Sequence, residues 1–180
     1  MEIFIDKNDN LKSAKGGVYA LGNFDGVHLG HKEIISKVIE ISISKNIPSG
    51  VLIFDPHPRN YFNPKLDDFI LSDIKTRSYL LEKTKLDFLG ILKFDEAMSN
   101  LSPREFIEKV IKDRVGVSHL IVGYNFRFGK NREGDVEILS KICSEYNIDL
   151  TIIEQVKNKE LIFSSSEIRK AIEELDFKRI

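Results

Sequence analysis

Residues 17–45, GVYALGNFDGVHLGHKEIISKVIEISISK, combine a short apolar run, a glycine-rich turn and a long amphipathic segment. The apolar run Gly17–Leu21 predicts a buried strand. The segment Lys32–Lys45 predicts a helix, because it places Ile34, Ile35, Val38 and Ile39 on one face. The turn between them, Gly22–His31, holds two histidines three residues apart at the mouth of that helix. This order of strand, turn and helix is typical of an α/β domain.

The same order recurs along the rest of the chain. Strands are predicted at Val51–Phe54, Phe88–Leu92, His119–Val122, Leu150–Ile153 and Leu161–Phe163. Helices are predicted from an Asp73 N-cap to about Lys85, after the capping box Ser102–Glu105, over Asp135–Tyr146, and from near Ser164–Ser166. The first two of these helices are expected to bury Ile74, Tyr79, Leu80 and Leu81, and Phe106, Ile107, Val110 and Ile111. The alternation predicts an α/β fold with a mostly parallel sheet.

Composition limits the class of protein. The 180 residues include 27 basic and 28 acidic side chains, so the net charge of −1 gives no basic field for nucleic acid. The single cysteine, Cys143, excludes an internal disulfide and fits a reducing compartment. No apolar run reaches the roughly 20 residues that span a bilayer, and the acidic, polar N-terminus is not a signal peptide. We therefore expect one cytoplasmic domain over residues 1–180, with neither nucleic acid nor a membrane as a partner.

Ligands of open parallel α/β sheets bind beyond the C-terminal ends of the strands. This rule predicts a site in the loops after Leu21, Phe54, Val122 and Phe163. In the first loop, glycines allow close backbone approach, and a helix N-terminus with two imidazoles, His28 and His31, favours phosphate. The spacing matches neither the P-loop nor the dinucleotide fingerprint. Two other interpretations stay open: the histidines cap the helix, or they form a metal site with Asp25.

The other loops carry unusual residues as well. Ile53–Phe62, IFDPHPRNYF, is stiffened by two prolines and carries aromatic side chains that suit a flat ring, although a strand exit with core aromatics would look similar. If Val122–Asp135, VGYNFRFGKNREGD, is extended, Tyr124, Phe126 and Phe128 share one face, with Phe126 in the core, and Asn125 and Arg127 share the other. Ser164–Arg169, SSSEIR, can cap a helix and also hold a phosphate.

These four blocks resemble, in order, the motifs of a known family. G-x-F-D-G-V-H-x-G-H over residues 22–31 is similar to the signature of the HxGH nucleotidyltransferase superfamily, in the form found in the FMN adenylyltransferase module of bacterial FAD synthetases. The other three blocks resemble that family's T-F-x-P-H-P, V-G-x-[DN]-F-x-F-G-x-x-R-x-G-D and S-S-[TS]-x-I-R segments. Ile53 stands where threonine is usual, and Ser166 is a mild departure.

The resemblance implies a doubly wound, Rossmann-like α/β fold with a mostly parallel sheet, a reaction and a set of site residues. ATP and FMN would give FAD and pyrophosphate by in-line attack of the FMN phosphate, with Mg²⁺ held mainly by the ATP phosphates and no protein ligand named. The catalytic residues implied are His28, His31 and Arg169. The residues implied for ATP are Gly22, Asn23, Phe24, Gly26, His28, Gly30, His31, Ser164, Ser165, Ser166 and Arg169. Those implied for FMN, whose isoalloxazine is flat, are Phe54, Pro56, His57, Pro58, Phe62, Asn125 and Arg127.

Two other functions stay open. One is a related nucleotidyltransferase that acts on another phosphorylated small molecule. The other is a non-catalytic module that binds flavin or nucleotide. Relatives of this module usually continue into a riboflavin kinase domain, and no segment here resembles one. The charged ending EELDFKRI favours a chain cut at a domain boundary over a natural stand-alone enzyme.

Overall fold

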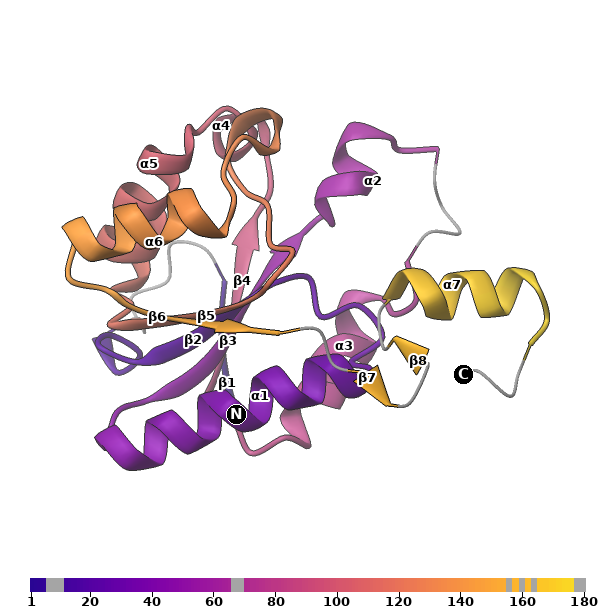
Figure 1. Cartoon of the computed structure of the whole chain (residues 1–180), viewed down its shortest axis with the longest axis horizontal. Coiled ribbons are helices and arrows are strands. Elements are labelled where there is room, and N and C mark those ends of the chain that lie inside the picture. Colours follow the sequence, from indigo (N-terminus) through magenta and orange to yellow (C-terminus); the bar gives the residue numbers. More distant parts are fainter. Residues whose placement is uncertain (6–11, 66–69, 155–156, 159–160, 163–164, 177–180) are drawn as a thin grey trace.

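Six parallel strands form the centre of the molecule in a computed structural model, which describes residues 1–5, 12–65, 70–154, 157–158, 161–162 and 165–176. Their order is β1-β4-β3-β2-β5-β6 (Figure 1). The strands are β1 (Glu2–Ile5), β2 (Val18–Leu21), β3 (Ser49–Asp55), β4 (Phe88–Lys93), β5 (His119–Gly123) and β6 (Asp149–Ile153). The predicted α/β fold with a doubly wound parallel sheet is confirmed.

The strand order reverses at β2. From β2 the chain moves outward through β3 to β4, then returns to place β5 on the other side of β2 and β6 beyond it. Such a reversal opens a crevice at the C-terminal ends of the two central strands, where ligands of doubly wound sheets bind. The turn after β2 and the loop after β5 flank this crevice, as the sequence predicts.

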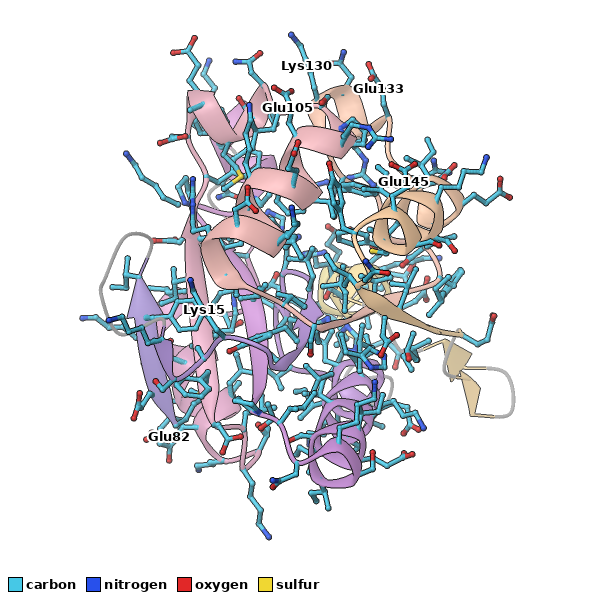
Figure 2. All side chains as sticks on the ribbon, turned by 90° about the vertical axis from the view of Figure 1, so that its left-hand side faces the viewer. Lys15, Glu82, Glu105, Lys130, Glu133 and Glu145 are labelled. Carbon is cyan, nitrogen blue, oxygen red and sulfur yellow. The ribbon has the colours of Figure 1, made fainter. Side chains whose placement is uncertain are left out.

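Helices cover both faces of the sheet (Figure 1). One core lies between the sheet and α1 (Leu29–Lys45) and α3 (Ile74–Glu82), and it includes Ile35, Val38 and Leu81. The other lies under the π-helix η3 (Phe106–Val115) and α6 (Val136–Glu145). Short helices complete the layers: α2 (Pro58–Phe62), α4 (Glu96–Ser99), α5 (Pro103–Glu105) and η4 (Lys130–Arg132). Charged side chains such as Glu82, Lys130 and Glu145 lie on the outside (Figure 2).

Side-chain caps start the helices where the sequence predicts. Asp73 accepts a hydrogen bond from the Thr76 amide at 2.7 Å and caps α3. Ser102 and Glu105 form the predicted capping box, with the Ser102 amide 3.0 Å from a Glu105 carboxylate oxygen. Beyond this box, the four residues predicted to face the core are all buried: Phe106, Ile107, Val110 and Ile111.

Several elements differ from the predictions. Strand β1 was not expected, and it pairs with β4 at the edge of the sheet. Leu161–Ile162 forms β8, which pairs antiparallel with β7 (Lys157–Asn158) outside the main sheet, while Phe163 lies outside the described residues. Tyr79 is 56% exposed, so its predicted place in the core is wrong, because α3 turns it to solvent. The last helix is α7 (Ser165–Glu173), and none of the helices described is long and apolar enough to span a bilayer.

Candidate functional site

The turn after β2 holds both predicted histidines at the start of α1. His28 is the N-cap, and its Nδ1 accepts a hydrogen bond from the His31 amide at 3.3 Å. The two imidazole rings stack with centroids 3.7 Å apart, and the His31 ring also packs 4.8 Å from the ring of Phe24. The interpretation of His28 as a cap is therefore confirmed. A cap made by Nδ1 leaves Nε2 to carry the proton of the neutral ring, so Nε2 is a hydrogen-bond donor.

Both rings are neutral at pH 7. Burial lowers the pKa of His28 to about 4, with Arg169 adding to the shift and Asp25 opposing it. Burial also holds the pKa of His31 well below its ordinary value, and the neighbouring His28 and Arg77 contribute in the same direction. Two buried atoms here, Nδ1 of His31 and Oδ1 of Asn23, have no hydrogen-bond partner among the described residues. Such atoms mark a place where a ligand can supply the missing partner.

The other residues predicted in this turn have structural roles that the contacts show. Gly26 has a φ of +79°, and a side chain there would meet Leu71. Phe24 is buried and supports the His31 ring. Gly22 continues the sheet by donating its amide to the Leu52 carbonyl, and Gly30 lies in the first turn of α1.

Asp25 is the centre of a buried polar network, with 1% of its surface exposed. Its carboxylate accepts hydrogen bonds from the Leu71 amide (3.0 Å), the Ser72 amide (2.9 Å) and the Ser72 hydroxyl (3.1 Å), and from the Arg169 guanidinium. Burial alone would raise the pKa of Asp25, but these donors and the nearby Arg77 lower it. Asp25 therefore stays ionised and joins the turn after β2 to α3 and α7.

Two members of this network were missed by the sequence analysis. The Ser72 hydroxyl accepts a hydrogen bond from the Gly26 amide at 2.9 Å, and Arg77 donates to the Ser72 carbonyl at 2.9 Å. Arg77 follows Ile74 by three residues and precedes Leu81 by four, so it lies on the buried face of α3. A charged residue at a helical core position is a signal that could have found it.

Helix α7 brings the predicted serine block to the same turn. The Ser165 hydroxyl donates to the Asp25 carbonyl at 3.0 Å, and the Arg169 guanidinium pairs with the Asp25 carboxylate. Figure 1 shows α7 beyond the end of the sheet at which α1 begins, near α3. Ser166 is exposed in the first turn, and the predicted Ser164 lies outside the described residues. His28, His31, Ser165 and Arg169, distant in the sequence, thus lie around one turn.

The loop after β3 ends in a second histidine cap. His57 is buried, caps α2 by accepting from the Arg59 amide at 3.1 Å, and has a pKa lowered to about 4, chiefly by burial. Pro58 is the first residue of α2, and Pro56 is exposed before it.

The aromatic side chains around this loop form a cluster. Phe94, which was missed by the sequence analysis, packs edge-on against Phe54, Tyr61 and Phe62 at 5.3–5.8 Å, and Phe62 is 68% exposed.

The loop after β5 differs from its prediction. Its start is not extended, because Tyr124 and Asn125 form a turn closed by a 3.0 Å bond from the Phe126 amide to the Gly123 carbonyl. Tyr124 is therefore exposed and does not share the packed face of Phe126 and Phe128, whose rings stack at 5.5 Å. Asn125 and Arg127 are both exposed, and Arg127 pairs with Asp135 at 3.3 Å. Among the described residues, neither Asn125 nor Arg127 forms a hydrogen bond or ion pair with the turn after β2.

The residues present do not form a ready-made metal site. Within the described ranges, no group of three or more His, Cys, Asp or Glu side chains is arranged to hold a metal ion. Asp25, the carboxylate considered with His28 and His31, already accepts four hydrogen bonds. The site therefore offers neutral donors, a helix N-terminus and a guanidinium, which is a donor set for phosphate.

Together the sheet order and this turn define a doubly wound α/β protein with a candidate phosphate site at its switch point. The family model of FAD synthetase matches residues 10–167, so the chain belongs to the FAD synthetase family. The bifunctional riboflavin kinase/FMN adenylyltransferase of Buchnera aphidicola subsp. Schizaphis graminum is 33% identical over 91% of this chain and 53% of its own length. The Escherichia coli K12 protein of the same name is 32% identical, with the same coverage. The chain thus spans about half the length of these curated relatives.

A solved structure shares the fold. The crystal structure of a protein described as a macrolide-efflux protein from Streptococcus pneumoniae matches with a TM-score of 0.79 over 94% of this chain and 55% of that chain. The sequence identity is 23%, so this likeness supports the fold and no statement about activity.

Proposed function

We propose that the protein is an FMN adenylyltransferase, which transfers AMP from ATP to FMN and releases pyrophosphate. Membership of the FAD synthetase family supports this proposal, as do relatives whose names include that activity. The observation that carries it is the turn in which His28 and His31 stand stacked at the N-terminus of α1, with Arg169 tied to the same turn through Asp25.

The chemistry would depend on positioning and charge stabilisation. The FMN phosphate would attack the α-phosphorus of ATP in line, and pyrophosphate would leave without a covalent intermediate on the protein. Nε2 of His28 and the free amides at the start of α1 would donate to the ATP phosphates. A neutral donor stabilises the charge on the departing pyrophosphate without giving up a proton. His31 and Arg169 would contribute at the same phosphates.

The adenylate pocket would be shaped by the turn itself, through Gly22, Asn23, Phe24, Gly26 and Gly30. Ser164, Ser165 and Ser166 would close over the triphosphate. FMN would occupy the side of the loops after β3 and β5, contacting Phe54, Pro56, His57, Pro58, Phe62, Asn125 and Arg127. The exposed ring of Phe62 and the exposed amide of Asn125 support this assignment, since both are available to a ligand.

Mg²⁺ would be bound mainly by phosphate oxygens, because the described residues offer no carboxylate cluster for it. When bound, it supplies charge neutralisation at the phosphates.

We further propose that residues 1–180 act as one adenylyltransferase domain in the cytoplasm, and that the riboflavin kinase activity named for the relatives requires a further domain.

The test is chromatography of the products from ATP, Mg²⁺ and either FMN or riboflavin. FAD from FMN, with no FMN from riboflavin, is expected. Equilibrium FMN binding with no FAD formed would instead indicate a non-catalytic module. A pyrophosphate-release screen of FMN against pantetheine phosphate, nicotinate mononucleotide and glycerol phosphate separates the remaining rival, and release with another substrate but not FMN would contradict the proposal.

A further inference from the structure

Arg77 has no part in the proposed reaction, yet it is charged and only 3% exposed. Its Nη2 donates to the Ser72 carbonyl and lies 3.8 Å from Oδ1 of Asp25. Its Nε has no hydrogen-bond partner among the residues that the structure describes. A buried guanidinium with an unpaired donor reduces stability, and an apolar side chain of similar volume is often at least as stable. Stability alone therefore does not explain the charge at this position.

Arg77 and Arg169 share one buried carboxylate, each nearest to a different oxygen. Oδ2 of Asp25 accepts from the Leu71 amide and from Arg169, while Oδ1 accepts from the Ser72 amide and hydroxyl. Arg77 is too far from Oδ1 for a hydrogen bond and contributes charge only. The other carboxylates that face Arg77 are those of Asp55 and Asp73, and both residues are exposed.

This sharing changes what happens to Asp25 if the Arg169 guanidinium moves away. Asp25 would keep three hydrogen bonds from Leu71 and Ser72 and the positive charge of Arg77. Without Arg77, the same movement would leave a buried carboxylate with no cation within ion-pair distance among the described residues. An uncompensated buried charge is strongly unfavourable, so Arg169 would stay bound to Asp25.

We propose that Arg77 is a positioning residue that releases Arg169 for the phosphates of ATP, by keeping Asp25 compensated when Arg169 turns toward the nucleotide. The inference rests on the proposed function, because ATP is the ligand that Arg169 would reach. It predicts that the charge of Arg77, more than its hydrogen bond to Ser72, controls ATP affinity. FMN affinity is expected to be independent of Arg77.

The test compares Arg77→Gln with Arg77→Lys by calorimetric titration of the whole chain with ATP, inorganic tripolyphosphate and FMN. Arg77→Gln keeps a donor without the charge, and we expect it to weaken binding of ATP and tripolyphosphate by about tenfold. Arg77→Lys keeps the charge and should stay within about threefold of the wild-type protein. Neither change should alter FMN binding. Arg104→Gln, which removes an exposed pair with Glu145, is the matched control and should change nothing.

A double-mutant cycle distinguishes the positioning role from a purely structural one, because the two roles predict different losses of ATP affinity in the double variant. Arg169→Gln alone should weaken ATP binding, and adding Arg77→Gln to it should cause no further loss, because Arg77 acts through Arg169. Melting temperatures accompany each variant, and Arg77→Met, which keeps the volume, replaces Arg77→Gln if that variant is unfolded.

Additive losses would overturn the inference, as would equal weakening by the Lys and Gln variants, an unchanged ATP affinity in Arg77→Gln, or a matching loss of FMN affinity. A wild-type protein that binds ATP but forms no FAD would contradict the proposed function and leave this comparison intact. A wild-type protein that does not bind ATP would overturn both.

Discussion

His28 shows how one side chain can serve the helix and the site together. Its Nδ1 caps α1, and the same hydrogen bond leaves Nε2 protonated and able to donate. From the sequence, a capping role and a phosphate-binding role were competing interpretations. The geometry makes them compatible, because each uses a different nitrogen of one neutral ring. His57 repeats this arrangement at the start of α2.

The lowered pKa values predict a loss of stability in mild acid. His28 and His57 have a pKa of about 4 in the folded protein, below the ordinary histidine value of 6.5. The unfolded chain therefore takes up protons first, and the stabilising contribution, complete above pH 6.5, is lost as the pH falls from 6.5 toward 4. Between pH 7 and pH 5 this amounts to about 1–2 kcal/mol for each ring.

His28→Asn tests this directly, since asparagine keeps an N-cap but does not titrate. The fall in Tm from pH 7 to pH 5 should be smaller in the variant by about 3–6 °C. Differential scanning calorimetry at the two pH values measures it, with Glu33→Ala, an exposed change in the same helix, as the control. Equal falls in the wild-type and His28→Asn proteins would mean that His28 is not protected from protonation.

His31 provides the sharpest prediction about turnover. His31→Ala should lower kcat for FAD formation by about 100-fold, while ATP and FMN affinities change little, because its contact strengthens as charge develops in the transition state. Steady-state kinetics and equilibrium titrations measure the two quantities separately. Glu33→Ala again serves as the control. An unchanged kcat in His31→Ala would show that His31 has no catalytic role.

For single residues, the sequence predicted the residue types that carry chemistry. It did not predict the hydrogen-bond network around Asp25 that positions them. The two histidines and the serine block were identified from local motifs. Ser72 and Arg77 were not, because their partner Asp25 is 47 and 52 positions away in the chain and no local pattern links them. The role of Asn125 and Arg127 stays a prediction.

Helix starts are where the elements were predicted best, since caps depend on residues within one turn. The box at Ser102 offers a test: Ser102→Ala removes the acceptor for the Glu105 amide and the hydroxyl bond to its carboxylate. We expect a loss of about 1 kcal/mol in the free energy of unfolding, measured in urea. Ser36→Ala, exposed within α1, is the control and should cause no loss. An unchanged stability would show that the first turn is held by packing alone.

Elements that depend on distant partners were predicted less well. Strand β1 is four residues long, and only its pairing with β4 identifies it. Leu161–Ile162 has the composition of a strand, but its partner is the adjacent β7 and not the main sheet. Phe106–Val115 presents the apolar face expected of an α-helix, and its π-helical hydrogen bonding leaves no local pattern in the sequence.

For the molecule as a whole, strand β2 joins the two cores. Val18 and Ala20 belong to the core under α1, and Tyr19 and Leu21 belong to the core under η3. Neither layer can lose its packing without exposing the other side of the same strand. We therefore expect one cooperative unfolding transition in urea, with coincident midpoints by circular dichroism and by tyrosine fluorescence and a slope of about 2–3 kcal/mol per M. Two separate midpoints would show that residues 1–180 do not behave as a single domain.

The central place of β2 also determines how amide hydrogen exchange should be distributed. All four of its residues are buried, and it is paired on both sides, so its amides should exchange only through global opening. The turn after β2, which carries His28, begins at the end of that strand, whereas Ser165 and Arg169 connect α7 to this turn by side-chain contacts with Asp25. The amide exchange rates of β2 should therefore not change when nucleotide binds, whereas those of α7 should fall. Nucleotide binding would then be read from the exchange of α7, with β2 as the internal reference.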